Sequence, residues 1–412
     1  MNISDPQPPQ PFETSRYGAL VINLGRALLH VGSPAHRLES AMQIMADRLG
    51  LKAEFFSTPT ALVVSLGDGS QQKTFLARSE PGTPNLGKLA DLSRVMEQLA
   101  DGSMSPEQAD ERVREVDQAS PAYRGFRLFL AYMLVSAGVC PLIGGGWREM
   151  LLAAGLGGVT GALVIGLGGR LDLSRLVIPV AAVLVTLLGT LWCGIDPATA
   201  LMPAIIAGLI ALLPGMDLTV STRELATGHL VSGASRLAST VMVFALLSFG
   251  MVFGGMLGQW WTGPVDLISP SPRPDWLLYA GFGLAAAGFT VLFQAHLRDW
   301  IWMVVACLVA FGGASLGQVT GAPVLGAFVG ALMVGLAGNL FVRFSGRPGS
   351  IMHLPGLILL VPGSIGMRSL AAMLGDDVIS GIETAMLAGI IAVALTTGMI
   401  LASVLLPPRT TL

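Results

Sequence analysis

Ten long apolar segments after residue 124 constrain the fold of this chain more than any other feature. A helix crosses the hydrocarbon core of a bilayer with about 20 mostly apolar residues, or fewer where it is short or broken. Because lipid offers no hydrogen-bond partner to the backbone, such a segment must satisfy its own polar groups, as a helix does. The segments are 127–143, 149–168, 176–193, 198–213, 233–258, 276–294, 300–317, 322–342, 351–374 and 380–405. The sequence therefore predicts an all-α polytopic membrane protein with about ten transmembrane helices.

The charges divide the chain into a soluble part and a membrane part. Of the 412 residues, 52% are hydrophobic and only 12% are charged, which is too apolar for an ordinary soluble protein. Residues 1–124 carry 15 of the 26 acidic side chains and 12 of the 24 basic ones. A formal net charge of −2 gives no sign of a nucleic-acid partner.

The sequence lacks the motifs of cofactor, metal and disulfide chemistry. Cys140, Cys193 and Cys307 lie in apolar segments without metal-ligand or CxxC spacing. No GxxxxGK[ST] run is present, which argues against ATP-driven transport by this chain alone. Residues 1–15 are proline-rich and lack the basic start and apolar core of a signal peptide, so we expect them to be disordered and uncleaved. We expect neither a cofactor nor a metal.

Residues 16–124 predict a small cytoplasmic α+β domain. Helical patterns at 17–31, 34–49, 85–100 and 106–118 accompany strands at 52–57, 60–66 and 72–78, with a hairpin turn at 67–69. His36 and Glu39, with Ser57 at a strand end, would suit a hydrolytic site. However, no nucleophile motif surrounds any serine, and a surface helix readily carries such charges. We therefore favour a docking or regulatory role for this domain.

The membrane part contains an internal sequence repeat. Leu-Leu-Pro-Gly at 212–215 is echoed by Leu-Val-Pro-Gly at 360–363, and Arg148-Glu149 is echoed by Arg298-Asp299. These landmarks lie 148 and 150 residues apart, which indicates a duplicated unit of that length. Each unit holds five apolar segments, and five is odd, so the second unit must enter the membrane from the opposite side. The sequence predicts two inverted five-helix repeats, 125–258 and 276–412, joined by an external linker, 259–275; secondary transporters commonly have this plan.

Arginine placement favours cytoplasmic termini. With residue 127 inside, nine arginines flank the inner ends of the segments and three flank the outer ends, as the positive-inside rule requires. The inner set is Arg127, Arg170, Arg175, Arg223, Arg236, Arg298, Arg343, Arg347 and Arg409, and the outer set is Arg148, Arg273 and Arg368.

Each repeat carries a proline-glycine break, Pro214-Gly215 in the first and Pro362-Gly363 in the second. A break frees backbone groups, and at membrane depth this is tolerated only against protein or a watery cavity. Paired breaks therefore point to a substrate site. The spacing of Ser221 and Glu224 predicts a capping box and a new helix, whose free N–H groups would bind a carboxylate.

Polar residues near the breaks are the candidates for binding. Asp217 and Glu224 would attract an ammonium group or exchange a proton, and Arg223 or Arg236 would meet a carboxylate. Asn339 is included because a buried amide needs partners. The candidate substrate-binding residues are Asp217, Thr219, Ser221, Arg223, Glu224, Ser232, Arg236, Asn339, Ser364 and Arg368. In the alternative interpretation, the segment after the first break is an interfacial loop. Asp196 and His353 are interpreted as ordinary loop and flanking residues.

Three stretches resemble the threonine/serine exporter (ThrE) family, and the likeness covers about residues 16–405. They are Gly32-Ser33-Pro34-Ala35-His36-Arg37-Leu38-Glu39 for its N-terminal signature; Pro214-Gly215, Leu218-Thr219, Glu224-Leu225-Ala226, Gly228, Ser232-Gly233 and Arg236 for its core motif; and Leu360-Val361-Pro362-Gly363 for its C-terminal motif. The resemblance implies a cytoplasmic N-terminal domain, about ten membrane helices, and efflux of threonine and serine driven by the proton gradient. Related systems with the halves on separate chains are associated with succinate export, so the fused halves here favour an amino acid.

The leading hypothesis is a secondary active transporter, not an enzyme, in a bacterial cytoplasmic (inner) membrane. It would export threonine or serine by alternating access, with protons as the coupling ion and the lipid bilayer as its surroundings. A homo-oligomer is left open. The alternatives are a dicarboxylate (succinate-like) exporter and a membrane-anchored hydrolase or sensor that acts through the N-terminal domain.

Overall fold

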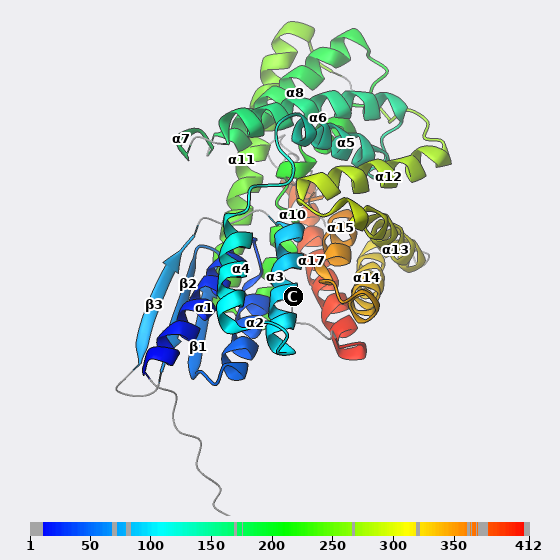
Figure 1. The fold of residues 1–412 in the computed structure, drawn as a ribbon. Coiled ribbons are helices and arrows are strands. Elements are labelled where there is room, and N and C mark those ends of the chain that lie inside the picture. The colour runs from blue at the N-terminus through cyan, green and yellow to red at the C-terminus, as the bar shows by residue number, and fades with distance from the viewer. Residues whose placement is uncertain are drawn as a thin grey trace, which may run out of the picture. The chain divides into compact units, whose positions relative to one another are not determined.

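The computed structural model of the protein is mostly helical (Figure 1). It describes residues 11–67, 72–79, 84–168, 171–174, 176–265, 268–318, 322–360, 363, 365–367, 369 and 378–407. The described chain divides into two compact units. One holds the residues up to Ser120 together with Thr227–Ser232, and the other holds Pro121–Ala226 and Gly233–Arg409.

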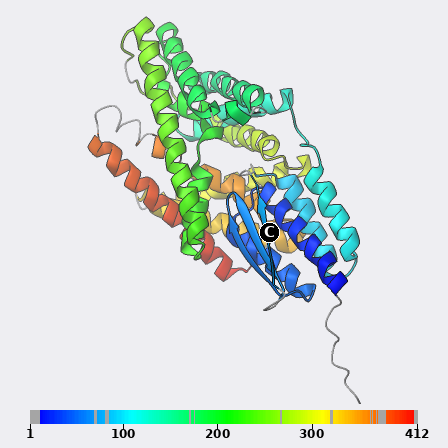
Figure 2. The ribbon, with the colours of Figure 1, turned by 90° about the vertical axis from the view of Figure 1, so that its left-hand side faces the viewer.

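The N-terminal unit is the predicted α+β domain. Its elements are α1 (Pro11–His30), α2 (Ala35–Arg48), β1 (Ala53–Thr58), β2 (Ala61–Leu66), β3 (Lys73–Arg78), α3 (Leu86–Ala100) and α4 (Pro106–Gln118). The strands form an antiparallel sheet in the order β1-β2-β3, seen in Figure 2. Alternate residues of β2, such as Leu62 and Val64, are buried, and Leu62 packs on α1 at Gly25. Gly67 ends β2 with φ 105°, while the rest of the predicted turn lies outside the described residues.

Helix α4 begins where the sequence predicts, at Ser105-Pro106. The Ser105 side chain accepts a hydrogen bond from the backbone N–H of Gln108, and Gln108 accepts one from the backbone N–H of Ser105. This capping box satisfies two N–H groups that the first helical turn leaves free.

In the second unit, helices occupy the described part of each of the ten predicted membrane segments. The elements are α5 (Phe126–Leu142), α6 (Trp147–Leu167), α7 (Leu171–Ser174), α8 (Val177–Ile195), α9 (Leu201–Gly208), η2 (Ile210–Leu212), α10 (Gly215–Ala226), α11 (Leu230–Thr262), α12 (Asp275–Leu292), η3 (Leu297–Asp299), α13 (Trp300–Gln318), α14 (Pro323–Ser345), α15 (Ser350–Leu360) and α17 (Val378–Leu405). Among the described residues, eight spans are long and apolar enough to cross a membrane, and the bent pair Leu201–Gly208 and Ile210–Ala226 would make a ninth. The shorter apolar helix Phe126–Leu142 accounts for the tenth segment. The chain is a multi-pass membrane protein.

Glycines let the membrane helices approach one another closely. A Cβ atom added at Gly313 of α13 would lie 2.7 Å from Cα of Gly330 of α14, and one at Gly317 would lie 2.6 Å from N of Gly326. Small residues four apart permit this backbone contact, as the sequence predicts, where lipid supplies no hydrophobic drive between helices. The lipid-facing side carries large side chains instead: Phe249 and Met256 of α11 are 62% and 67% exposed.

The crossing of α5 and α12 shows that the repeats are inverted. A Cβ atom at Gly138 would lie 2.7 Å from the carbonyl oxygen of Gly281, and one at Gly288 would lie 2.9 Å from the carbonyl oxygen of Ala131. Gly288 is Gly138 plus 150 residues, and Gly281 is Ala131 plus 150. Each glycine thus meets the same position of the other helix, which is the mark of a two-fold relation. Because later residues of one helix meet earlier residues of the other, the helices are antiparallel, and the axis lies across them.

Equivalent contacts recur within the two repeats. The Thr160 hydroxyl donates to the Gly208 carbonyl at 2.9 Å, and the Cys307 thiol lies 4.0 Å from the Pro355 carbonyl, 147 residues further on. Arg148 pairs with Asp196 and Asp299 pairs with Arg347, each across 48 residues; the charges are reversed, and Asp299 is one residue past the match of Arg148. These contacts confirm the duplication predicted from spacing.

Candidate functional site

The two helix breaks meet in the membrane unit. Helix α9 ends at Gly208 and α10 starts at Gly215, and the segment Ile210–Ala226 is bent by 50° from Leu201–Gly208. A Cβ atom added at Gly363 would lie 3.5 Å from Cα of Gly215 and 3.6 Å from Cβ of Leu213. Pro362 lies outside the described residues. The paired breaks predicted from the sequence are therefore neighbours in space.

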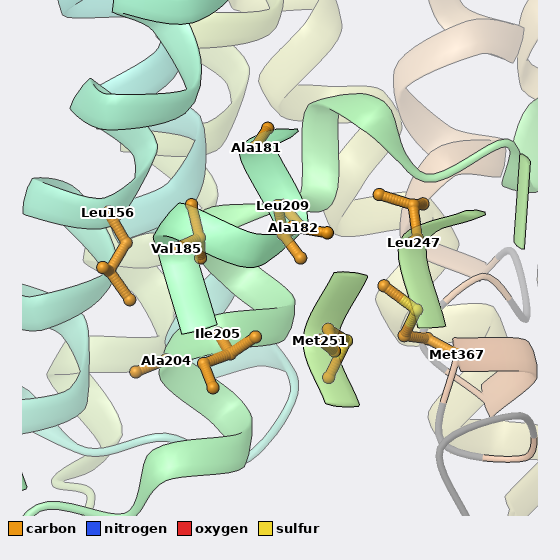
Figure 3. Packing of buried hydrophobic residues seen from close by; sticks show 10 residues of the cluster. All are labelled: Leu156, Ala181, Ala182, Val185, Ala204, Ile205, Leu209, Leu247, Met251 and Met367. Atoms are coloured by element: carbon orange, nitrogen blue, oxygen red, sulfur yellow. The ribbon is translucent and has the colours of Figure 1, made fainter. Parts of the chain in front are cut away.

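After each break, the chain packs against the opposite repeat. Met216, just after the first break, joins a cluster of second-repeat residues that includes Leu357 and Leu395. Met367, after the second break, packs among first-repeat residues, beside Leu247 and Met251 in Figure 3. The exchange places the breaks at the interface of the two repeats.

The polar contacts of the two crossings are also equivalent. The Thr396 hydroxyl donates to the Thr219 carbonyl at 3.5 Å, and the Ser248 hydroxyl lies 3.8 Å from the Met367 sulfur. Thr396 is Ser248 plus 148 residues, and Met367 is Thr219 plus 148. The pseudo-two-fold relation therefore extends to the site.

Three charged side chains meet beside the first break. Arg236 of α11 donates from Nε to Glu224 Oε2 at 3.2 Å and from Nη1 to Asp217 Oδ1 at 3.0 Å. Glu224 is fully buried, Arg236 is 17% exposed and Asp217 is 51% exposed. A buried carboxylate is costly unless it is paired, and Arg236 supplies a positive partner to Glu224. With both carboxylates ionised, the group carries a net charge of −1.

Hydroxyl groups lie along α10, the helix that carries Asp217 and Glu224. Thr222 of α10 and Thr396 of α17 face each other with their hydroxyl oxygens 2.8 Å apart. Thr219 is buried, and its hydroxyl donates to the Gly215 carbonyl at 3.4 Å. This side of α10 therefore presents hydroxyls to the second repeat.

The predicted capping box at Ser221 is wrong. Helix α10 already begins at Gly215, where the Leu218 N–H donates to the Pro214 carbonyl at 3.1 Å. Ser221 is therefore inside the helix, and its hydroxyl donates to the Leu218 carbonyl at 2.8 Å. Pro214 sets the helix start because its ring fixes the backbone and needs no hydrogen-bond acceptor. The segment is a helix and not the interfacial loop of the alternative interpretation.

Other predicted binding residues lie elsewhere. The Asn339 amide donates to the Leu406 carbonyl at 2.8 Å and to the Ala402 carbonyl at 3.4 Å, so it holds the C-terminal end of α17. Ser232 is buried in the segment Thr227–Ser232 of the N-terminal unit, and Arg223 is half-buried on α10. Ser364 and Arg368 lie outside the described residues.

Asp196 and His353, which were interpreted as a loop residue and a flanking residue, lie in different surroundings. Asp196 lies in the turn after α8, as expected, where it also accepts from Thr199. His353, expected to be a flanking residue, is buried inside α15 and packs against Gly338 of α14. Helix α15 starts at Ser350, so His353 lies in its first turn, on the packed face.

Sequence reasoning missed Thr222, Thr396 and Ser248. The available signal was the spacing of the repeat, because Ser248 and Thr396 are 148 residues apart, the same offset as the two breaks. A search for polar residues at matched positions of the two units would have found this pair.

His36, Glu39 and Ser57, which were predicted to suit a hydrolytic site, lie close together in the structure and make structural contacts. Glu39 accepts the backbone N–H of Ser57 at 2.7 Å and lies 3.2 Å from His229 Nε2. The His36 and His229 rings meet edge to face, 6.2 Å apart. In this arrangement Glu39 links the backbone of Ser57 at the end of β1 to His229. The described part of the chain contains no group of three or more His, Cys, Asp or Glu side chains placed to hold a metal ion.

The sequence was compared with known protein families. Residues 19–258 and 265–406 match the profile of the ThrE family, described as "Putative threonine/serine exporter". The chain belongs to the ThrE family. The match covers both repeats and most of the N-terminal unit, so the predicted resemblance is confirmed. Membership of a family described as putative exporters agrees with the prediction that the chain is not an enzyme.

Similar proteins are found in fungi. The chain is 27% identical over 378 residues to pheromone-regulated membrane protein 10 of Debaryomyces hansenii, covering 89% of this chain and 37% of that protein. It is 27% identical over 377 residues to an uncharacterized protein of Schizosaccharomyces pombe, covering 87% and 44%. The chain thus spans less than half the length of these relatives. They do not support the prediction of a bacterial cytoplasmic membrane. No solved structure matches the sequence.

Proposed function

We propose that this protein is a secondary active transporter that exports a small hydroxy amino acid, threonine or serine, by alternating access of its two inverted repeats. One observation carries the proposal: Arg236 is held between Asp217 and Glu224 where the two helix breaks meet. Inverted repeats with broken helices at their interface are the plan of many secondary transporters.

The charge pattern suits a zwitterion. The substrate carboxylate would take the place of Asp217 on Arg236, because Asp217 is the more exposed of the two carboxylates. Asp217, once released, would accept the substrate ammonium group. Glu224 would stay on Arg236 and keep the guanidinium in position. Recognition of both charged ends therefore follows from exchanging one ion pair.

The hydroxyl of the substrate would bind near Thr222 and Thr396. These hydroxyls face each other across α10 and α17, one from each repeat. A hydroxyl both donates and accepts, so a third hydroxyl can join the pair. A site that hydrogen-bonds a substrate hydroxyl discriminates strongly against the analogue that lacks it. Alanine would then be a poor substrate.

Proton coupling would use Asp217, while Glu224 stays on Arg236. After the substrate leaves, a movement of the repeats that separates Asp217 from Arg236 would leave Asp217 without a positive partner, and an unpaired carboxylate at membrane depth takes up a proton. Proton uptake and substrate binding would then exclude each other, as antiport requires.

A dicarboxylate such as succinate is the second candidate, and the charges disfavour it. Arg236 is already faced by two carboxylates, so a dianion would enter a site of net negative charge. Export of a dianion would need further arginines at the breaks, for which Arg223 and Arg368 are the candidates.

We further propose that the N-terminal domain and both termini are cytoplasmic and that the domain regulates transport. The segment Thr227–Ser232, which comprises the turn after α10 and the first three residues of α11, belongs to the N-terminal unit. His229 of this segment contacts Glu39. The domain is therefore continuous with both helices that carry the ion-pair residues.

Counterflow in proteoliposomes tests the proposed function. Labelled serine, threonine, alanine and succinate would be compared side by side under an imposed pH gradient. We expect uptake of serine and threonine that responds to the gradient, with alanine at least about tenfold slower. Uptake of succinate alone would overturn the amino-acid proposal and favour the dicarboxylate.

Replacing Asp217 with asparagine is expected to reduce gradient-driven serine counterflow by about 100-fold while leaving the protein folded. The amide cannot take up a proton or pair with an ammonium group, whereas Arg236 keeps its contact with Glu224. Asp275→Asn, at the exposed start of α12, is the matched control and should transport normally. Normal transport by Asp217→Asn would remove this carboxylate from the mechanism.

A further inference from the structure

The three-stranded sheet of the N-terminal unit turns one of its faces toward the helices of that unit. Leu62 of β2 packs on α1 at Gly25, and Ala77 of β3, which pairs with Leu62, is buried as well. Successive side chains of a strand point to opposite faces, so the residues between these buried ones form a second face. We call it the outer face; it consists of alternate residues of 54–58, 61–65 and 74–78, the first of each included.

An apolar row crosses the outer face. Phe56 of β1 pairs with Val63 of β2, and Val63 pairs with Leu76 of β3. Phe56 is 49% exposed and Leu76 is 64% exposed. Single exposed apolar residues are ordinary on a protein surface, whereas a contiguous row of them indicates a contact surface. Lys73 and Arg78, at the two ends of β3, disfavour the pairing of another strand along its edge, so a partner is expected to cover the face.

Two opposite charges flank the apolar row at diagonal corners of the outer face. On one side of the row, Glu54 of β1 pairs with Ser65 of β2. On the other side, Arg78 of β3 pairs with Ala61 of β2. Glu54 and Arg78 are both exposed, so each of them is open to a charged partner.

This placement of the charges makes the outer face complementary to itself. Two copies that meet through the same face are related by a two-fold axis in the plane between them, here near Val63. When the axis is perpendicular to the line from Glu54 to Arg78, each Glu54 faces the partner's Arg78, and two ion pairs form. When the axis runs along that line, like charges meet. The charges therefore select one arrangement of the two copies.

The sizes of the side chains suit the same arrangement. In it, the strands of the two sheets cross at a steep angle, close to the orthogonal packing of sheets. Phe56 then lies nearest to the partner's Ala61, and Leu76 lies nearest to the partner's Ser65. A large side chain thus meets a small one at each of these positions, as close packing requires.

We propose that the outer face binds the outer face of a second copy of this chain, so that the protein is a homodimer in its membrane. The apolar row forms the centre of the contact, and the pairs of Glu54 with the partner's Arg78 fix its orientation. The contact is small compared with the roughly 20–30 residues per side of a standard interface. We therefore expect an association that depends on confinement of both copies to one bilayer, which raises their local concentration. The proposal concerns assembly and does not depend on the proposed transport function.

Two-colour single-molecule tracking in supported bilayers tests the proposal. The full chain is labelled at Ser103→Cys, in a background in which alanine replaces the three native cysteines, and the fraction of molecules that co-diffuse is measured. Glu54→Arg and Arg78→Glu each place like charges opposite one another, so either variant should lower this fraction at least about tenfold. When the two variants are mixed, each in its own colour, opposite charges meet at both contacts, and co-diffusion should return to the parental value.

Recovery in the mixture also shows that both single variants are folded. Phe56→Ser removes apolar contact without changing the charge and should weaken the association as well. Glu97→Arg, at an exposed position of α3, is the matched control and should associate like the parent. Parental copies that diffuse singly would leave the outer face to a lipid surface or another protein and overturn the proposal. Single variants that associate like the parent, or a mixture that does not recover, would also overturn it, because the copies would then meet through another surface.

Discussion

Replacing Arg236 with alanine is expected to reduce serine counterflow to background and to lower the free energy of unfolding by about 3–5 kcal/mol. Glu224 is fully buried and accepts from Arg236 Nε, while Asp217 accepts from Nη1. Removing the guanidinium takes the ion pair at 3.2 Å from the buried Glu224, and the substrate loses the group that would bind its carboxylate. The initial rate of labelled-serine counterflow and thermal unfolding in detergent measure the two effects.

The two effects of losing Arg236 can be separated. The double variant Arg236→Ala/Glu224→Gln also removes the buried charge of Glu224, so stability should largely return while transport stays at background. Arg236→Lys keeps the charge but cannot reach two carboxylates with the geometry of a guanidinium, so partial transport is expected. Arg298→Ala, at an exposed arginine of η3, is the matched control and should behave like the parent. Transport at the parental rate by Arg236→Ala would contradict the proposed site.

Substituting Gly138 with alanine is expected to disrupt the association of the repeats and to destabilise the protein by about 3 kcal/mol. The new Cβ atom would lie 2.7 Å from the Gly281 carbonyl oxygen and 2.8 Å from Cα of Ala285. Both are backbone atoms, which cannot rotate away as a side chain would. The helices α5 and α12 must therefore separate, and both repeats move with them. Thermal unfolding and the yield of folded protein in detergent report the loss.

The pseudo-symmetry supplies the matched variants for this prediction. Gly288→Ala places a Cβ atom 2.9 Å from the Ala131 carbonyl oxygen, so it should destabilise the protein to a similar extent. Gly283→Ala, on the same helix, meets nothing within 4 Å and should be neutral or slightly stabilising. A neutral Gly138→Ala would show that α5 and α12 do not cross at this position.

The sequence predicts the membrane helices and the duplication well because both signals are local or periodic. Apolar runs of the required length identify spans without any knowledge of their packing. The offset of 148 to 150 residues between matched motifs, with an odd number of segments between them, indicates the inversion that the contact of Gly138 and Gly281 confirms. The ThrE resemblance rests on the same motifs.

The site is less predictable because it is made where the repeats cross. Nothing local indicates that Met216 packs in the second repeat or that Met367 packs in the first. The partnership of Thr222 with Thr396 joins residues 174 positions apart, and it becomes visible only once α10 lies on α17. The start of α10 was misplaced for another reason: Ser221 and Glu224 have the spacing of a capping box, but Pro214 ends the preceding segment and starts the helix about two turns earlier. The proline at 214 therefore determines the helix start, and the capping-box spacing of Ser221 and Glu224 does not.

A disulfide across the two breaks tests the central claim most directly. In the background without the three native cysteines, Gly215→Cys/Gly363→Cys should form a bond on oxidation, because a Cβ atom at Gly363 would lie 3.5 Å from Cα of Gly215. Alternating access requires the repeats to move against each other at this point, so the bond should lower serine counterflow at least about tenfold, and reduction should restore it. If no bond forms, or if the cross-linked protein transports serine as fast as the reduced one, the breaks are not the moving site of transport.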